Sequence, residues 1–132
     1  MRILLLAVLI AQCTWAAEWK VQYFYDDDRE TLHFTALAFP SANRGIAVGV
    51  ITDEEGSRRP RPVAVLTADG GTTWAQTKLD DYPVSLFFLD DSTGWMLTEG
   101  GLWKTEESGR TWKRISKQKR GSLIKIDRKS VV

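Results

Sequence analysis

The chain has 132 residues, the size of one domain, with 18 Lys or Arg against 17 Asp or Glu. So small a net charge gives it no overall attraction to nucleic acid. It holds one cysteine and one histidine, which excludes a disulfide framework and a zinc site made of Cys and His. No metal or other cofactor is expected.

The first 16 residues resemble a secretory signal peptide. Arg2 supplies a short positive region, Ile3 to Ala11 is an apolar run, and Thr14-Trp15-Ala16 offers a cleavage site. The run is too short to cross a bilayer, which takes about 20 residues, so no membrane span is expected. The alternative is a buried first strand. We expect export to the periplasm or the cell exterior, with cleavage near Ala16 that also removes Cys13.

Residues 17–132 have the composition of an all-β domain. Short runs rich in Val, Ile, Leu, Phe and Trp are separated by Gly, Asp, Asn, Ser and Pro. They predict two units of four antiparallel strands, at 35–39, 45–52, 63–67 and 73–78, and then at 84–89, 95–98, 102–105 and 111–115. The run Val84 to Leu89 is so uniformly apolar that we expect it to be buried on both faces.

An octapeptide occurs twice, 38 residues apart. It reads Thr67-Ala68-Asp69-Gly70-Gly71-Thr72-Thr73-Trp74 and then Thr105-Glu106-Glu107-Ser108-Gly109-Arg110-Thr111-Trp112. A period between about 20 and 50 residues indicates a repeat architecture. The repeats are predicted at about 33–78 and 83–116.

Two partial repeats flank these units. Ser122 to Asp127 mirrors Ser85 to Asp90, so a partial repeat is predicted at 121–132, and Trp19-Lys20-Val21 resembles the fourth strand of a unit. Because a β-propeller takes about four to eight such blades, we predict an incomplete propeller with two nearly complete blades and partial first and last ones.

The octapeptide suits a tight turn between strands. Asp69 can accept hydrogen bonds from nearby backbone N–H groups, and Gly70 and Gly71 allow a positive φ. The motif resembles the Asp box, Ser/Thr-x-Asp-x-Gly-x-Thr-Trp, of the bacterial-neuraminidase-repeat (BNR) β-propellers. The positions that match or correspond to it are Thr67, Asp69, Gly71, Thr73, Trp74, Thr105, Glu107, Gly109, Thr111 and Trp112. Glu107 departs from the motif, and its longer side chain predicts a looser second turn.

The sequence Asp90-Asp91-Ser92-Thr93-Gly94-Trp95 resembles the subgroup of this family related to photosystem II stability and assembly factors. The resemblance implies a propeller fold in which the Asp box is structural and not catalytic. The family includes sialidases, sortilin-type receptors and exported proteins without known chemistry, so the fold does not choose among them.

A sialidase-like site needs three arginines for the substrate carboxylate, a Tyr nucleophile paired with a Glu, and an Asp acid/base. The Arg-Ile-Pro signature of those enzymes is missing, and the candidate nucleophiles are Tyr23, Tyr25 and Tyr82. With His33 as the single histidine, no Ser-His-Asp triad is recognisable. No catalytic residue is therefore predicted, and the alternative is the N-terminal fragment of a sialidase-like glycoside hydrolase.

A partner surface is predicted on the loops between second and third strands. In up-and-down blades these loops share one end with the links between blades, which places residues 53–62, 79–83 and 26–31 together. Long loops on a rigid scaffold often carry binding. Arg58, Arg59 and Arg61 would suit a carboxylate or an acidic partner surface, and with Tyr82 they are the candidate partner-binding residues. A tolerated surface insertion whose charges neutralise one another is preferred over binding for the 53–62 loop, and a solvated loop is preferred over a calcium site at Asp26-Asp27-Asp28.

The sequence thus predicts an exported, non-catalytic propeller scaffold for protein–protein interaction or assembly. Residues 113–132 carry eight Lys or Arg against Asp127 alone, which favours solvated edges, with a weak anionic partner as the alternative. Open sheet edges template pairing with other chains, so self-association is a further expectation.

Overall fold

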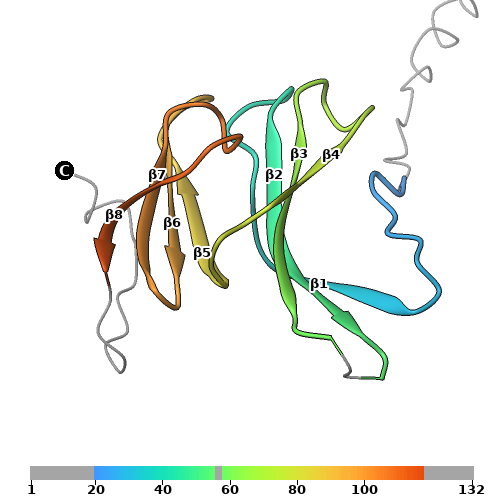
Figure 1. Ribbon diagram of the computed structural model, residues 1–132. Coiled ribbons are helices and arrows are strands. Elements are labelled where there is room, and N and C mark those ends of the chain that lie inside the picture. The colour runs from blue at the N-terminus through green and yellow to red at the C-terminus, as the bar shows by residue number, and fades with distance from the viewer. Residues whose placement is uncertain (1–19, 56–57, 118–132) are drawn as a thin grey trace, which may run out of the picture.

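The computed structural model describes residues 20–55 and 58–117, which form two four-stranded antiparallel sheets side by side (Figure 1). The first sheet has the order β1 (Glu30–Ala38), β2 (Gly45–Asp53), β3 (Arg61–Thr67) and β4 (Ala75–Lys78). The second has the order β5 (Pro83–Phe88), β6 (Gly94–Thr98), β7 (Gly101–Thr105) and β8 (Lys113–Lys117). The predicted all-β fold with blade-type sheets is confirmed.

Some sequence predictions lie outside the described residues. These are the signal peptide at 1–16 with Cys13, Trp19, and the partial repeat at 121–132. Within the described ranges the chain forms no helix, and therefore none that could span a membrane.

The core lies between the two sheets. Ile46, Val48 and Ala64 of the first sheet pack with Met96 and Trp103 of the second and with Leu79 of the connection. The residues that alternate with these on the same strands point to the opposite face. Burial of large apolar side chains between the sheets is the main stabilising contribution, since each is worth about 1.5–3 kcal/mol.

The two sheets repeat one packing detail. A Cβ built on Gly45 would lie 2.6 Å from Cε1 of Phe39, and one built on Gly94 would lie 2.8 Å from Cδ1 of Phe88. Each glycine thus makes room for an aromatic ring at the end of the preceding strand, Phe39 directly after β1 and Phe88 as the last residue of β5. The two glycine–phenylalanine pairs are therefore equivalent positions in the two sheets.

The prediction that Val84 to Leu89 is buried on both faces is wrong. Val84 is 44% exposed and Leu89 is 63% exposed. The reason is that β5 is the first strand of its sheet and, among the described strands, pairs only with β6 and packs mainly against β1 of the first sheet. Within the described part of the chain, one side of this edge strand therefore has no neighbouring strand.

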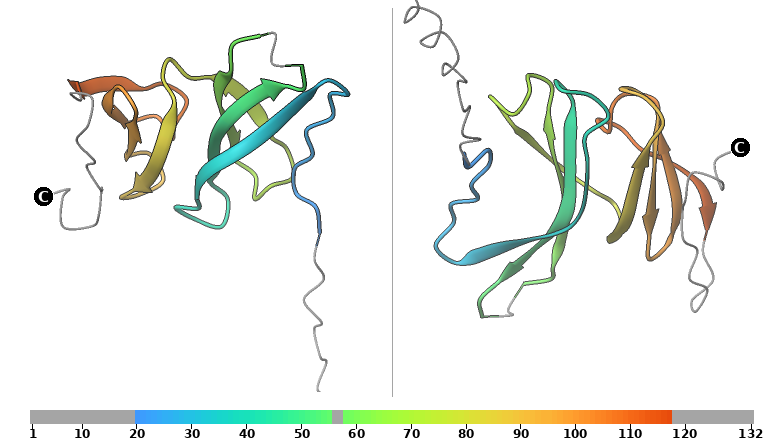
Figure 2. Two further views of the ribbon diagram at one scale, coloured as in Figure 1. Left: turned by 90° about the horizontal axis from the view of Figure 1, so that it is seen from below. Right: turned by 180° about the vertical axis from the view of Figure 1, so that it is seen from behind.

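The N-terminal segment crosses the face of the first sheet that points away from the second (Figure 2). Its residues 20–27 form no strand, so the fourth-strand-like conformation expected at Lys20 and Val21 is not seen. A strand of that kind needs a third strand beside it, and the described residues provide none there. Tyr23 instead packs edge-on against Phe34 and Trp74, with ring centroids 6.1 and 6.0 Å away.

Candidate partner-binding surface

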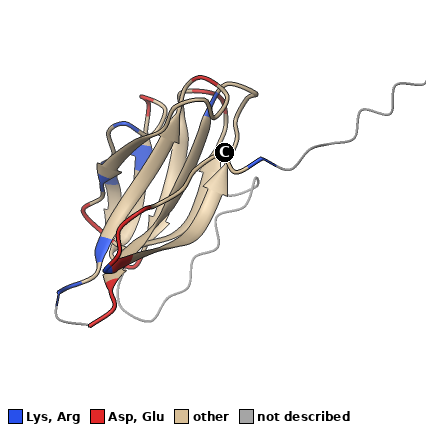
Figure 3. Ribbon diagram, turned by 90° about the vertical axis from the view of Figure 1, so that its right-hand side faces the viewer, with Lys and Arg blue, Asp and Glu red and all other residues tan. Residues whose placement is uncertain are grey.

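Three segments meet at one end of the sheets, which we call the charged end: residues 26–31, residues 53–55 with 58–62, and residues 79–83. The octapeptide turns lie at the other end (Figure 1), and Figure 3 shows acidic and basic residues on the loops at the ends as well as basic residues along the strands. Hydrogen bonds join the three segments, from Glu54 N to Arg29 O (3.2 Å), from Leu79 N to Pro62 O (2.9 Å) and from Tyr82 Oη to Pro60 O (3.0 Å). The predicted meeting of these segments is confirmed.

Glu30, the first residue of β1, lies at the centre of the charged end. Its side chain is only 10% exposed. It accepts hydrogen bonds from the Arg61 guanidinium (2.5 Å) and from the Tyr25 hydroxyl (2.7 Å), and it forms an ion pair with Arg58 (3.6 Å). A desolvated carboxylate needs such partners, because burying it alone is costly. Glu30 therefore holds the β2–β3 connection against the start of β1.

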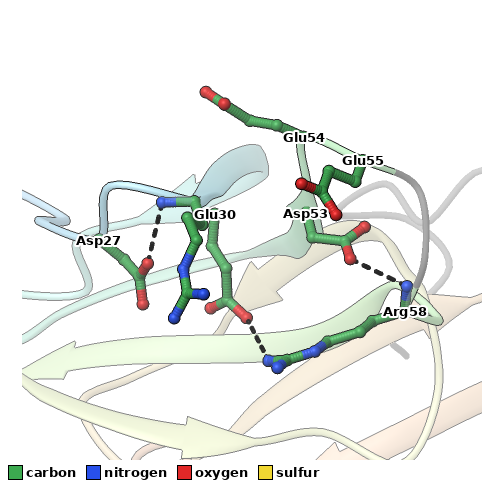
Figure 4. Close-up of a pocket in the computed structure, with 7 residues that line it drawn as sticks. Asp27, Glu30, Asp53, Glu54, Glu55 and Arg58 are labelled. Carbon is green, nitrogen blue, oxygen red and sulfur yellow. Dashed lines mark hydrogen bonds and ion pairs between the residues drawn. The ribbon is translucent and has the colours of Figure 1, made fainter.

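A pocket of about 140 Å³ lies beside Glu30 (Figure 4). Backbone amides bind two of its acidic side chains, with Arg29 N donating to Asp27 Oδ1 (3.1 Å) and Arg58 N donating to Asp53 Oδ2 (2.9 Å). Carboxylates outnumber guanidinium groups in its lining, which is Asp27, Arg29, Glu30, Asp53, Glu54, Glu55 and Arg58. The pocket therefore favours a cationic group over an anion.

Metal binding at this end was one alternative from the sequence. Asp26, Asp27 and Asp28 are exposed, and only Asp27 lines the pocket. In the described part of the chain, no group of three or more His, Cys, Asp or Glu side chains is arranged to hold a metal ion.

The carboxylate of Glu30 affects the protonation of the Tyr25 phenol. Burial, the hydrogen bond to Glu30 and the nearby negative charge raise the pKa of Tyr25 to about 12. The phenol is therefore protonated at neutral pH and acts as a hydrogen-bond donor. Burial also raises the pKa of Tyr23 above its usual value of 10.0.

The predicted contact residues differ in their surroundings. Arg58 and Arg61 already face the carboxylate of Glu30. Tyr82 is half-buried and donates to Pro60 O, whereas Arg59 is exposed and forms no ion pair with any described residue. Their role in binding a partner stays a prediction.

The sequence analysis did not predict that Glu30 lies at the centre of the charged end, nor that it accepts a hydrogen bond from Tyr25. Glu30 and Arg61 are 31 residues apart, and their pairing follows from the β1–β2–β3 order. The one local signal was the acidic run before the first strand, which gives no indication of which carboxylate is buried.

The first octapeptide turn is closed by two side chains. Thr67 Oγ1 accepts a hydrogen bond from Gly71 N (2.8 Å) and donates to Asp69 Oδ1 (2.9 Å). Asp69 also accepts from Thr73 N (2.9 Å) and from the Thr73 hydroxyl. Gly70 and Gly71 have φ values of 68° and 87°. The turn geometry expected from the sequence is thus present.

The second octapeptide turn keeps only part of this network. Thr105 Oγ1 accepts from Gly109 N (3.0 Å), and Glu107 accepts from the Thr111 hydroxyl. Asp69 accepts a hydrogen bond from the backbone amide of Thr73. Among the hydrogen bonds of the described residues, Glu107 accepts no corresponding bond from a backbone amide. Ser108 takes a φ of 58°, a conformation that a non-glycine residue adopts at a cost. Fewer side-chain bonds thus close the second turn, as the longer Glu side chain predicted.

No protein-family model matches the chain, and no curated protein matches it. Among solved structures, the chain is similar to one described as "YCF48 bound to D1 peptide", with 25% identity and a TM-score of 0.48. The alignment covers 68% of this chain and 27% of that chain, so this chain spans about a quarter of the length of that chain.

Proposed function

We propose that this chain is an exported, non-catalytic scaffold of the Asp-box propeller class that binds another protein through its charged end. The observation that carries the proposal is the network around Glu30, which fixes the β2–β3 connection and leaves Glu54, Glu55 and Arg59 exposed beside a pocket. Charges held in place before binding orient a partner at little entropic cost. The two octapeptide turns support the class, and the N-terminal sequence pattern supports export.

Site-specific cross-linking in the producing cells tests this proposal. A photo-reactive residue at position 59 should give one discrete cross-linked species, and the same residue at position 91, an exposed site at the octapeptide end, should not. Glu30→Gln should weaken the cross-link, because the amide cannot hold Arg58 and Arg61 in place by charge. Equal cross-linking from both positions, or none from position 59, would contradict the proposal.

One observation favours a second candidate, glycoside hydrolysis. Tyr25 donates to Glu30 within reach of Arg58 and Arg61, which resembles the Tyr–Glu pair and arginines that a sialidase-like site needs. Two features weigh against it: the arginines pair with Glu30 itself, and the pKa of Tyr25 is raised to about 12. Hydrolysis of an aryl sialoside that is lost in Tyr25→Phe would favour this candidate over the scaffold.

A further inference from the structure

A second cavity lies between the sheets at the octapeptide end. It is a groove of about 390 Å³ with Leu66, Ala75 and Thr77 of the first sheet on one side and Ser108 and Arg110 of the second octapeptide on the other. Its charged lining residues are Arg44, from the turn before β2, and Arg110; none of the lining residues is Asp or Glu. The groove is therefore opposite in charge to the pocket beside Glu30.

The two arginines have no carboxylate partner within the described ranges. Three other described arginines do, since Arg58 and Arg61 pair with Glu30 and Arg114 pairs with Asp81, whereas Arg29 and Arg59 form no ion pair with a described residue. Asp69 and Glu107, the acidic residues of the octapeptides, accept hydrogen bonds from Thr73 and Thr111 within their own turns. Among the described residues, the two positive charges that line the groove thus form no ion pair.

Both arginines extend from anchored backbone. The turn of Arg44 is bonded to the first octapeptide, with Gly70 N donating to Asn43 O (3.0 Å), and Arg44 N donates to Ser41 Oγ (3.3 Å). The second octapeptide is bonded to the β5–β6 turn, with Ser108 N donating to Ser92 O (2.9 Å). The backbone from which each arginine side chain extends is therefore held in place before any ligand arrives.

We propose that this groove binds an oxyanion, a carboxylate or a phosphate group, between Arg44 and Arg110. A guanidinium group binds either oxyanion, carboxylate or phosphate, through two parallel charge-assisted hydrogen bonds. The hydroxyls of Thr77 and Ser108 supply further donors, and Leu66, Ala75 and Trp74 can contact a short apolar part of the ligand. The site lies at the opposite end from the charged end, so it does not rest on the proposed function.

NMR titration of the arginine side-chain Nε–H signals tests the site with two probes, inorganic phosphate and a blocked glutamate (N-acetyl-glutamate amide). Saturable shifts of Arg44 and Arg110 support the proposal, and the probe that binds more tightly identifies the oxyanion. Arg44→Ala and Arg110→Ala should each weaken binding about tenfold or more. Lys113→Ala, which removes a positive charge from exposed β8, is the control and should leave binding unchanged.

Two results would overturn the proposal. The first is the absence of a saturable shift at Arg44 or Arg110 with either probe. The second is equal weakening by Lys113→Ala and by the arginine variants, which would show general charge attraction and no defined site. Arg44→Lys keeps the charge but loses the bidentate geometry, so it should bind less tightly than the unchanged protein.

Discussion

At the scale of single residues, the buried hydroxyl of Thr67 stabilises the first octapeptide turn. Thr67 is 5% exposed, and Thr67→Val keeps its shape but leaves Gly71 N without an acceptor. We expect a loss of about 1–3 kcal/mol in the free energy of unfolding, measured by urea denaturation. Thr67→Ser retains the hydroxyl and should recover most of this loss.

The same change in the second turn supplies a comparison. Thr105→Val also removes an acceptor, from Gly109 N, but Thr105 makes no hydrogen bond to Glu107's carboxylate among those of the described residues. Thr67→Val additionally removes a donor to Asp69, so it should be the more destabilising of the two.

For position 67 itself, an equal loss of stability in Thr67→Val and Thr67→Ser would show that the hydroxyl contributes nothing.

Two turn carboxylates make stability depend on acid pH. Hydrogen bonds from the Thr73 side chain and backbone hold the pKa of Asp69 below its usual value, and the Thr93 and Ser92 amides do the same for the pKa of Asp90. Because these pKa values are lower in the folded state, the stabilisation is complete above the unfolded-state pKa of about 3.9. It is lost as the pH falls through the folded-state values.

We therefore expect urea midpoints to fall as the pH drops below about 4. Asp69→Asn and Asp90→Asn should each make the midpoint less dependent on pH in this range. Asp91→Asn changes an exposed neighbour and serves as the control. If the urea midpoint depends on pH as steeply in Asp69→Asn and Asp90→Asn as in the unchanged protein, the acid sensitivity does not come from these two carboxylates.

At the scale of elements, β1 and β2 depend on a glycine. The register of β1 on β2 shifts between Phe34 and Ala36, opposite Gly49, and a Cβ on Gly49 would lie 2.2 Å from the His33 carbonyl oxygen. The backbone of the bulge thus occupies the space where a side chain would stand. Gly49→Ala should force the strands apart and cost about 1–3 kcal/mol.

Thermal or urea unfolding measures this cost, and hydrogen exchange of the β1 amides shows whether the pairing is disturbed. His33→Ala is the matched control, because it removes an exposed side chain and leaves the carbonyl in place. A stability of Gly49→Ala equal to that of the control would mean that the bulge adjusts without strain.

The strands could be predicted because each is local in sequence. Expected strands at 45–52 and 102–105 correspond to β2 (Gly45–Asp53) and β7 (Gly101–Thr105). The first half of β1 was missed, since Glu30 to Phe34 mixes polar and apolar residues directly after an acidic run. The candidate surface was predicted only as far as its loops, because the burial of Glu30 depends on three strands meeting, which no single segment encodes.

At the scale of the whole molecule, the first strand of each sheet presents large apolar side chains to solvent. Among the described residues, five of the eight large hydrophobic side chains that are exposed lie on or directly after these strands, at Phe34, Leu37, Phe39, Val84 and Leu89. β1 and β5 are also edge strands in the described sheets. Exposed apolar surface of this kind marks an interaction site or a tendency to aggregate.

We therefore expect the purified protein to associate with a second copy through this surface. Sedimentation velocity should show a weight-average mass that rises with concentration. The double variant Leu37→Lys with Leu89→Lys should lower that mass, since each introduced charge would have to be desolvated in the contact. Val21→Lys makes the same kind of change on the N-terminal segment, where the side chain is also exposed, and should have no effect. A monomeric mass at every concentration would contradict the prediction. If Val21→Lys lowered the weight-average mass as much as the double variant does, the contact would lie elsewhere.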